Sequence, residues 1–206
     1  MSASGILFII SAPSGAGKTS LLRELVPGDE RLVMSVSHAT RAPRPGEVDG
    51  AHYHFVDIER FEQLIGEGAF LEHARVFDNF YGTAEAAVRD QLERGLDVIL
   101  EIDWQGARQV RRRFPEAVSV FIAPPSIEAL RARLSARGQD GPEVVERRMR
   151  DARSELSHFP EYDYLVINDD FATALNDLRT VVGAERLREP RQARRFAGAL
   201  GEMLGQ

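Results

Sequence analysis

The sequence contains no cysteine among its 206 residues. Disulfide bonds, thiolate nucleophiles and zinc sites built on cysteine are therefore excluded, and a cytoplasmic protein is expected. Lysine is almost as scarce, because all of the 26 lysine and arginine residues except Lys18 are arginine. Because the chain uses arginine at every other cationic position, the single lysine indicates that position 18 requires an ammonium group.

Long apolar runs are also missing. The longest, Ile6 to Ile10, is far shorter than the ~20 residues of a membrane span. No basic residue precedes it, as a signal peptide would require, so we expect neither a membrane partner nor secretion. The formal net charge of -6 argues against a general nucleic-acid binder. For the arginine-rich segment 186–195 we favour a solvated helix end over a nucleic-acid contact.

Hydrophobic patterning predicts an α/β fold with a parallel sheet flanked by helices. Short apolar runs typical of strands buried on both faces occur at 5–11, 96–102, 118–123 and 164–167. Amphipathic helical patterns lie between or after them, at 19–26, 105–114, from 127 onward behind the N-cap Ser126, 143–156 and 171–187. Strands that alternate with helices in this way form a parallel sheet.

Two segments interrupt the alternation. Residues 36 to about 82 hold short mixed runs with one short helix at 58–65, which indicates a small strand-rich insertion. Residues 137–142, Arg-Gly-Gln-Asp-Gly-Pro, predict a loop between two arginine-rich helices.

A glycine-rich segment directly after the first predicted strand carries a phosphate-binding motif, Ala12-Pro13-Ser14-Gly15-Ala16-Gly17-Lys18-Thr19. It has the Walker A layout, with Ala12 in place of the first glycine. Gly15 and Gly17 allow backbone N–H groups to turn inward around phosphates, and the next helix adds its positive N-terminus. Lys18 would reach the β- and γ-phosphates of a bound nucleotide, and the Thr19 hydroxyl would hold Mg²⁺. The alternative is an ordinary glycine-rich turn, which the position of the sole lysine disfavours.

Two carboxylates lie at the end of the second predicted strand, in Glu101-Ile102-Asp103, where P-loop proteins position the metal ion and its bound water. Alternation along the strand predicts that Glu101 and Asp103 lie on the same side. The Asn-Lys-x-Asp signature of GTPases is excluded because there is no second lysine. The short chain and its inserted segment favour a small nucleotide kinase.

Further motifs, taken with the phosphate loop, point to a known family. They are Ser35-Val36-Ser37-His38-Ala39-Thr40-Arg41-Ala42-Pro43-Arg44-Pro45-Gly46-Glu47, Phe70-Leu71-Glu72-His73-Ala74, Asn79-Phe80-Tyr81-Gly82-Thr83, Glu101-Ile102-Asp103-Trp104-Gln105-Gly106 and Val166-Ile167-Asn168-Asp169-Asp170. In this order, and over essentially the whole chain, they resemble guanylate kinase. The match is close to the bacterial enzymes, Ala12 included.

The resemblance implies the reaction ATP + GMP ⇌ ADP + GDP, with dGMP as a further acceptor and with ATP and Mg²⁺ as cofactors. It also implies three parts: a core P-loop domain (1–35, 89–125 and 155–206), a GMP-binding domain (36–88) and a helical lid (126–154). The oligomeric state stays open.

Carried over position by position, the resemblance implies roles for individual residues. Arg41, Arg44, Tyr53 and Tyr81 would hold the GMP phosphate, together with Glu47. Ser37, Glu72, Thr83 and Asp103 would surround guanine. Arg133, Arg137 and Arg148 would act from the lid, with Arg133 and Asn168 at ATP, and Lys18, Arg41, Arg137 and Arg148 would be catalytic. Thr19 and Glu101 would hold Mg²⁺, although Glu101 stands where the family often has Asp.

The chemistry of these side chains supports the same roles. Guanidinium groups bind a dianionic phosphate in a fixed geometry, and phenol hydroxyls add uncharged donors. Phosphoryl transfer depends on positioning and charge neutralisation, so no catalytic histidine is needed. Taken singly, Arg41 and Arg44 fit a surface ion pair, the two tyrosines fit core packing, and Glu72 fits the polar face of a strand.

Two other functions fit parts of the pattern. A non-catalytic interaction module built on the guanylate kinase fold is disfavoured because the phosphate loop and the lid arginines are intact. A P-loop kinase of another small phosphorylated acceptor would keep the ATP site. Glu72 with Ser37 and Thr83 favours guanine over that alternative.

Overall fold

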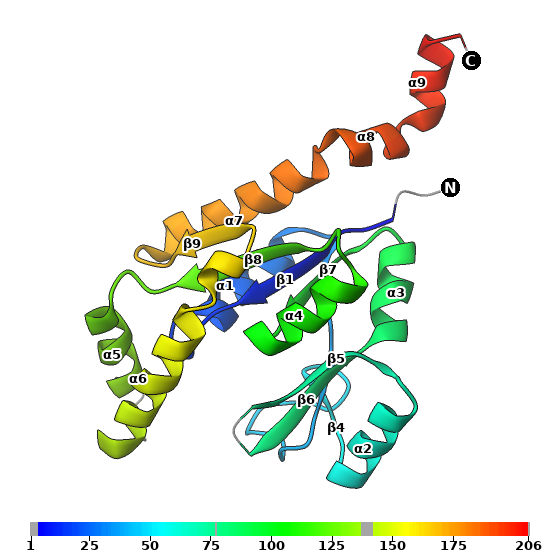
Figure 1. Cartoon of the computed structure of the whole chain (residues 1–206). Helices are drawn as coiled ribbons and strands as arrows, with labels where there is room; N and C mark the ends of the chain where they lie inside the picture. The colour runs from blue at the N-terminus through cyan, green and yellow to red at the C-terminus, as the bar shows by residue number, and fades with distance from the viewer. Residues whose placement is uncertain (1–3, 77, 137–141, 206) are drawn as a thin grey trace.

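The computed structural model describes residues 4–76, 78–136 and 142–205. A central parallel sheet lies between helices, and a smaller second sheet and a helix pair are attached to it (Figure 1). The helices are α1 (Lys18–Leu25), α2 (Ile58–Gly66), α3 (Glu85–Glu93), α4 (Trp104–Arg113), α5 (Ile127–Ser135), α6 (Pro142–Leu156), α7 (Phe171–Arg186), α8 (Glu189–Arg195) and α9 (Ala197–Met203). None of the helices in the described ranges has the length and apolar composition of a membrane span. The predicted α/β class and the strand-rich insertion are confirmed.

Five strands form the central sheet, in the order β2 (Leu32–Met34), β7 (Asp97–Glu101), β1 (Leu7–Ser11), β8 (Val118–Ala123) and β9 (Tyr164–Ile167). Every pairing in it is parallel. The middle strand β1 is buried along its whole length because helices cover both faces of the sheet. Ile10 pairs with Glu101, so the phosphate loop and Glu101 leave the sheet at the same edge.

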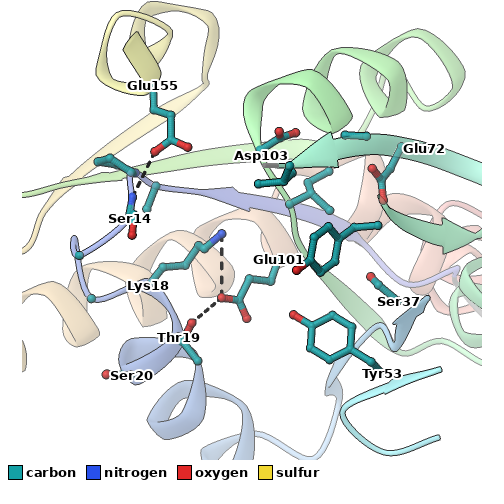
Figure 2. Close-up of a pocket in the computed structure, with 18 residues that line it drawn as sticks. Ser14, Lys18, Thr19, Ser20, Ser37, Tyr53, Glu72, Glu101, Asp103 and Glu155 are labelled. Carbon is teal, nitrogen blue, oxygen red and sulfur yellow. Dashed lines mark hydrogen bonds and ion pairs between the residues drawn. The ribbon is translucent and has the colours of Figure 1, made fainter. Parts of the chain in front are cut away.

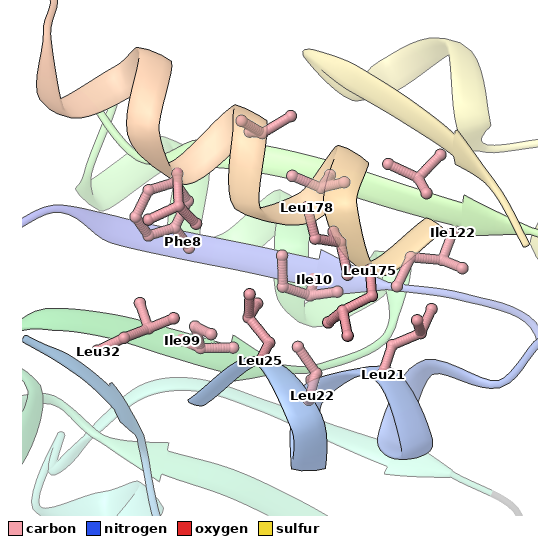
Figure 3. Close-up of a cluster of buried hydrophobic side chains, with 14 of the residues drawn as sticks. Phe8, Ile10, Leu21, Leu22, Leu25, Leu32, Ile99, Ile122, Leu175 and Leu178 are labelled. Carbon is pink, nitrogen blue, oxygen red and sulfur yellow. The ribbon is translucent and has the colours of Figure 1, made fainter. Parts of the chain in front are cut away.

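Alternation along β1 divides the core between the two faces of the sheet. Phe8 and Ile10 pack in one cluster with side chains of α1 and α7 (Figure 3). Leu7 and Ile9 pack in the other with side chains of α3 and α4. Burial of each side chain of this size contributes about 1.5–3 kcal/mol. The loop that follows β1 therefore starts from a strand held on both sides.

The second sheet has the order β4 (Tyr53–Phe55), β3 (Ser37–Ala39), β6 (Asn79–Ala84) and β5 (Phe70–Val76). β3 and β4 are parallel, whereas β6 pairs antiparallel with both β3 and β5. Helix α4 connects this sheet to the core through the side-chain amide of Gln109. Its oxygen accepts from the His73 N–H at 3.2 Å, and its nitrogen donates to the His73 carbonyl at 2.8 Å. This double contact holds β5, which carries Glu72, against the core.

Helices α5 and α6 form the attached pair. They pack on each other through a small cluster that includes Leu130, Leu134 and Met149. Ser126 caps α5 as predicted, because its hydroxyl accepts from the Ala129 N–H at 3.1 Å. The loop predicted at 137–142 lies mostly outside the described residues.

Several elements differ from the sequence predictions. β2, α3 and α9 are not predicted, since short or weakly periodic segments carry little signal of their own. The predicted strand 96–102 ends at Glu101. Asp103 is instead the N-cap of α4 and accepts from the Gly106 N–H at 2.9 Å. The prediction that Glu101 and Asp103 alternate along one strand is therefore wrong.

Candidate active site

The phosphate loop connects β1 to α1 with two residues in the left-handed region. Gly15 and Gly17 have φ values of +87° and +93°, which residues with a Cβ adopt only at a cost. A Cβ on Gly17 would also lie 2.3 Å from Nδ2 of Asn168. That Nδ2 donates to the Ala16 carbonyl at 2.7 Å. Asn168 thus braces the loop, and its predicted place near adenine stays a prediction.

Lys18 and Thr19, the first two residues of α1, both face Glu101 (Figure 2). The Thr19 hydroxyl donates to Oε1 of Glu101 at 2.6 Å. The Lys18 Nζ lies 3.9 Å from the same oxygen. A hydroxyl, a carboxylate and an ammonium group therefore meet at the mouth of the loop. These are groups able to hold a divalent cation and the phosphates bound to it.

A buried carboxylate with two hydroxyl groups lies on the second sheet. Glu72 is 4% exposed and Thr83 is fully buried. The Thr83 hydroxyl donates to Oε1 of Glu72 at 2.6 Å, and the Ser37 Oγ lies 3.1 Å from the Thr83 Oγ1. Since Thr83 has only one hydroxyl hydrogen, Ser37 is the donor in the second contact. Both hydroxyl hydrogens are thus used within the protein, and one must turn to serve a ligand.

Burial raises the pKa of Glu72 to about 7. The Thr83 hydrogen bond acts in the opposite direction, and the nearby charge of Asp103 adds to the rise. Gly106 gives the carboxylate its room, because a Cβ there would lie 2.5 Å from Oε2 of Glu72. The sequence contains Gly106 in the family motif, but only this contact explains why a glycine is needed.

The residues predicted at the GMP phosphate form a neighbouring group. Arg41 donates to Oε2 of Glu47 at 2.5 Å and to Oε1 at 2.7 Å. The same carboxylate accepts from the Arg44 N–H at 2.7 Å. The hydrogen bond from Arg41 lowers the pKa of Glu47 to about 2 and raises that of Arg41. The guanidinium also lies 4.9 Å from the centre of the Tyr53 ring, so its orientation is set from two sides.

Two adjoining cavities collect most of the predicted residues. The first, about 300 Å³, is lined by residues that include Ser14, Gly15, Gly17, Lys18, Thr19, Ser37, Tyr53, Glu72, Tyr81, Glu101 and Asp103. The second, about 530 Å³, is lined by Arg41, Arg44 and Glu47 among others. Thr19, Ser37, Tyr53 and Glu101 line both cavities, which makes the two continuous. A phosphate loop, a buried carboxylate and two arginines therefore surround one cleft.

The lid-side arginines are placed differently. Arg133 donates to the Asn168 carbonyl at 2.8 Å and lines neither of these cavities. Arg148 is half-buried on α6. Arg137 lies outside the described residues. The predicted roles of these three arginines stay predictions.

Among the charged residues that line the first cavity, Glu155 has no counterpart in the sequence predictions. Glu155, near the end of α6, accepts from the Ser14 backbone N–H at 3.1 Å (Figure 2). It lines the first cavity with the phosphate loop. No local pattern marks it, because it is one carboxylate on the polar side of a helix and lies 141 residues from its partner.

The chain is similar to known proteins over most of its length. The family model described as guanylate kinase matches residues 4–185. A guanylate kinase of Alkalilimnicola ehrlichii is 59% identical over 98% of this chain and 99% of its own length. One of Chromohalobacter salexigens is 57% identical over 98% and 94%. In the crystal structure of guanylate kinase from Anaplasma phagocytophilum, 35% identical, the match covers 93% of this chain and 91% of that one with a TM-score of 0.75.

Proposed function

The chain belongs to the guanylate kinase family, and we propose that the cleft described above transfers the γ-phosphoryl group of ATP to GMP. The assignment of roles rests on one observation: a site suited to phosphates and a site suited to a base lie on the same cleft. A phosphate loop with the only lysine stands on one side, and a buried carboxylate with two hydroxyls stands on the other. The chain is accordingly a nucleoside monophosphate kinase.

We assign ATP to the loop 12–19. Its backbone N–H groups and the N-terminus of α1 favour an anion, and Lys18 adds a point charge beside the β- and γ-phosphates. The residues also fit Mg²⁺, because Thr19 and Glu101 present hard oxygen ligands at hydrogen-bond distance from each other. When bound, Mg²⁺ neutralises charge on the β- and γ-phosphates. In the described ranges no group of three or more acidic or histidine side chains could hold a metal ion alone, so phosphate oxygens would complete the coordination.

We assign the phosphate of GMP to Arg41, Arg44, Tyr53 and Tyr81. Arg41 is already oriented by Glu47 and by the Tyr53 ring, so little conformational freedom is lost when it meets a dianion. Glu47 then acts as the positioning group of Arg41. In the reaction a phosphate oxygen of GMP forms a bond to the γ-phosphorus as the bond from that phosphorus to the β,γ-bridging oxygen breaks. ADP leaves with that bridging oxygen.

We assign guanine to Glu72, Ser37, Thr83 and Asp103. Guanine N1–H and the N2 amine are donors that one carboxylate accepts together, whereas N1 of adenine is an acceptor and would face the carboxylate lone pairs. Either hydroxyl can turn its hydrogen to guanine O6 once the base is present. A buried carboxylate without its donors is costly, so AMP should be rejected by several orders of magnitude.

The remaining roles concern the helix pair and the division of the chain. We propose that Arg137 and Arg148 bring positive charge to the transferred group, and that Arg133 and Asn168 border the ATP site. The boundaries proposed are 1–35, 89–125 and 155–206 for the core, 36–88 for GMP binding and 126–154 for the lid. A cytoplasmic location and use of dGMP are part of the same proposal.

A coupled assay of ADP release tests the proposal. ATP would be supplied with GMP, dGMP, AMP, CMP and UMP in turn. We expect turnover with GMP and dGMP and almost none with the others. Turnover confined to a different monophosphate would support a kinase of another acceptor, and no turnover with any of them would support a non-catalytic module.

A further inference from the structure

The negatively charged Glu155 side chain lies at the phosphate loop, the segment to which we assign the negatively charged phosphates of ATP. It comes from α6, and its Oε2 accepts from the Ser14 N–H at 3.1 Å (Figure 2). Glu155 lines the first cavity together with residues of the loop and with Glu101 and Asp103.

The groups around the Glu155 carboxylate both favour and oppose its negative charge. Lys18 attracts the Glu155 carboxylate, and the Ser14 N–H donates to it. Burial and the nearby carboxylates of Asp103 and Asp151 act against its charge. A carboxylate and a phosphate are both anionic acceptors, and they would meet the same cation and the same amide. One backbone N–H has a single hydrogen, so it serves one strong acceptor at a time.

We propose that the Glu155 carboxylate and a phosphate oxygen of ATP compete for the Ser14 amide. The inference rests on the proposed assignment of ATP to the loop 12–19. Binding of ATP displaces the carboxylate, since two anions at this site repel each other. Glu155 therefore competes with ATP and weakens its binding. It also couples α6 to whether the phosphate loop holds ATP.

The displacement has a consequence for α6. Arg148 stands seven residues before Glu155, which is about two helical turns, so both side chains leave the same face of α6. Loss of the contact with Ser14 removes a hydrogen bond between the phosphate loop and the C-terminal end of α6, the helix that carries Arg148.

The test measures binding without turnover. ATP and, separately, inorganic tripolyphosphate are titrated by calorimetry into wild type, Glu155→Gln and Glu155→Ala. Removal of the charge should tighten both ligands about fivefold to tenfold and leave GMP binding unchanged. Glu143→Gln is the matched control, because it removes the same charge from an exposed position in the first turn of α6. It should bind both ligands as wild type does.

A second readout follows the contact directly. The amide resonance of Ser14 should move when tripolyphosphate is added to wild type, and it should already be displaced in ligand-free Glu155→Ala. Two results would mean that Glu155 only braces the loop. One is ATP binding by both Glu155 variants that is equal to or weaker than that of wild type. The other is a Ser14 resonance that shifts neither with tripolyphosphate nor with Glu155→Ala. Turnover is assayed on the same preparations. Turnover without tighter binding refutes this inference alone, and tighter binding without turnover refutes the proposed function alone.

Discussion

Both terminal nitrogens of the Arg41 guanidinium donate to the two carboxylate oxygens of Glu47, at 2.5 and 2.7 Å. The pair lies beside Tyr53 in the cavity that also holds Arg44. Because the pKa of Glu47 is lowered to about 2, the pair stays ionised throughout the range in which enzymes are assayed. The proposed phosphate-binding arginine is therefore held in one orientation before its ligand arrives.

Replacement of Glu47 should weaken GMP binding through Arg41. Glu47→Gln keeps the shape but offers only one oxygen, so the guanidinium loses one of its two fixed contacts. We expect the KM for GMP to rise about tenfold, with the KM for ATP unchanged. A double-mutant cycle with Arg41→Lys checks the cause. If the two effects simply add, Glu47 does not act through Arg41.

Lys18 should be needed for chemistry and not for folding. Lys18→Arg keeps the charge but replaces a compact ammonium group by a wide planar one at the loop. We expect a folded protein whose kcat falls by on the order of 10²-fold, or about 2.7 kcal/mol. Circular dichroism and thermal unfolding give the folding control. Near-normal turnover in this variant would remove the role assigned to the sole lysine.

Glu72 should select guanine. Glu72→Gln turns one acceptor oxygen into a donor that faces the guanine donors, so kcat/KM for GMP should fall by on the order of 10²-fold, roughly 2.7 kcal/mol, while ATP affinity holds.

The stability of Glu72→Gln separates this effect from damage to the fold. Damage to the fold would lower the free energy of unfolding, whereas we expect the variant to be more stable than wild type. A raised folded-state pKa means that the carboxyl loses stabilisation as the pH rises from 4.5 to about 7. At pH 8 the ligand-free variant should be more stable by on the order of 1–3 kcal/mol.

GMP affinity should depend on pH through the same carboxyl. The ligand-free pKa of Glu72 is about 7, and guanine requires the ionised form. Affinity should therefore fall as the pH drops below about 7, approaching tenfold per pH unit. Calorimetric titrations between pH 5.5 and about 8.5 measure this, and Glu72→Gln removes the protein's contribution while the GMP phosphate still titrates. Identical pH profiles for both proteins would contradict the prediction.

A methyl group at position 106 should displace the Glu72 carboxylate and so weaken GMP binding. The Cβ of Gly106→Ala would lie 2.5 Å from Oε2, so the buried carboxylate must shift. We expect the KM for GMP to rise about tenfold or more, with ATP binding preserved. Gly183→Ala in α7 is the matched control, since nothing lies within 4 Å of its Cβ and helix propensity favours alanine by about 1 kcal/mol. Equal GMP kinetics in Gly106→Ala and Gly183→Ala would show that Gly106 does not affect the guanine-binding site.

Apolar runs predicted the longer strands of the central sheet, and β8 and β9 have the predicted bounds. The phosphate loop was also predictable, because a strand, two glycines, a lysine and a helix start follow one another within a few residues. Local chain geometry decides such features, so neighbouring residues carry the whole signal. The family motifs then marked Glu72, Arg41 and their companions as candidates, without their contacts.

Only the tertiary structure decided those contacts. Thr83 lies opposite Glu72 because β5 and β6 pair in a register that shifts between Phe70 and Glu72. The Ser14–Glu155 contact joins a loop to a helix 141 residues away, and the short strand β2 depends on its pairing with β7. Buried polar groups must find partners wherever the fold brings donors and acceptors together. Which partners those are depends on packing over long sequence separations, and no local pattern in the chain records it.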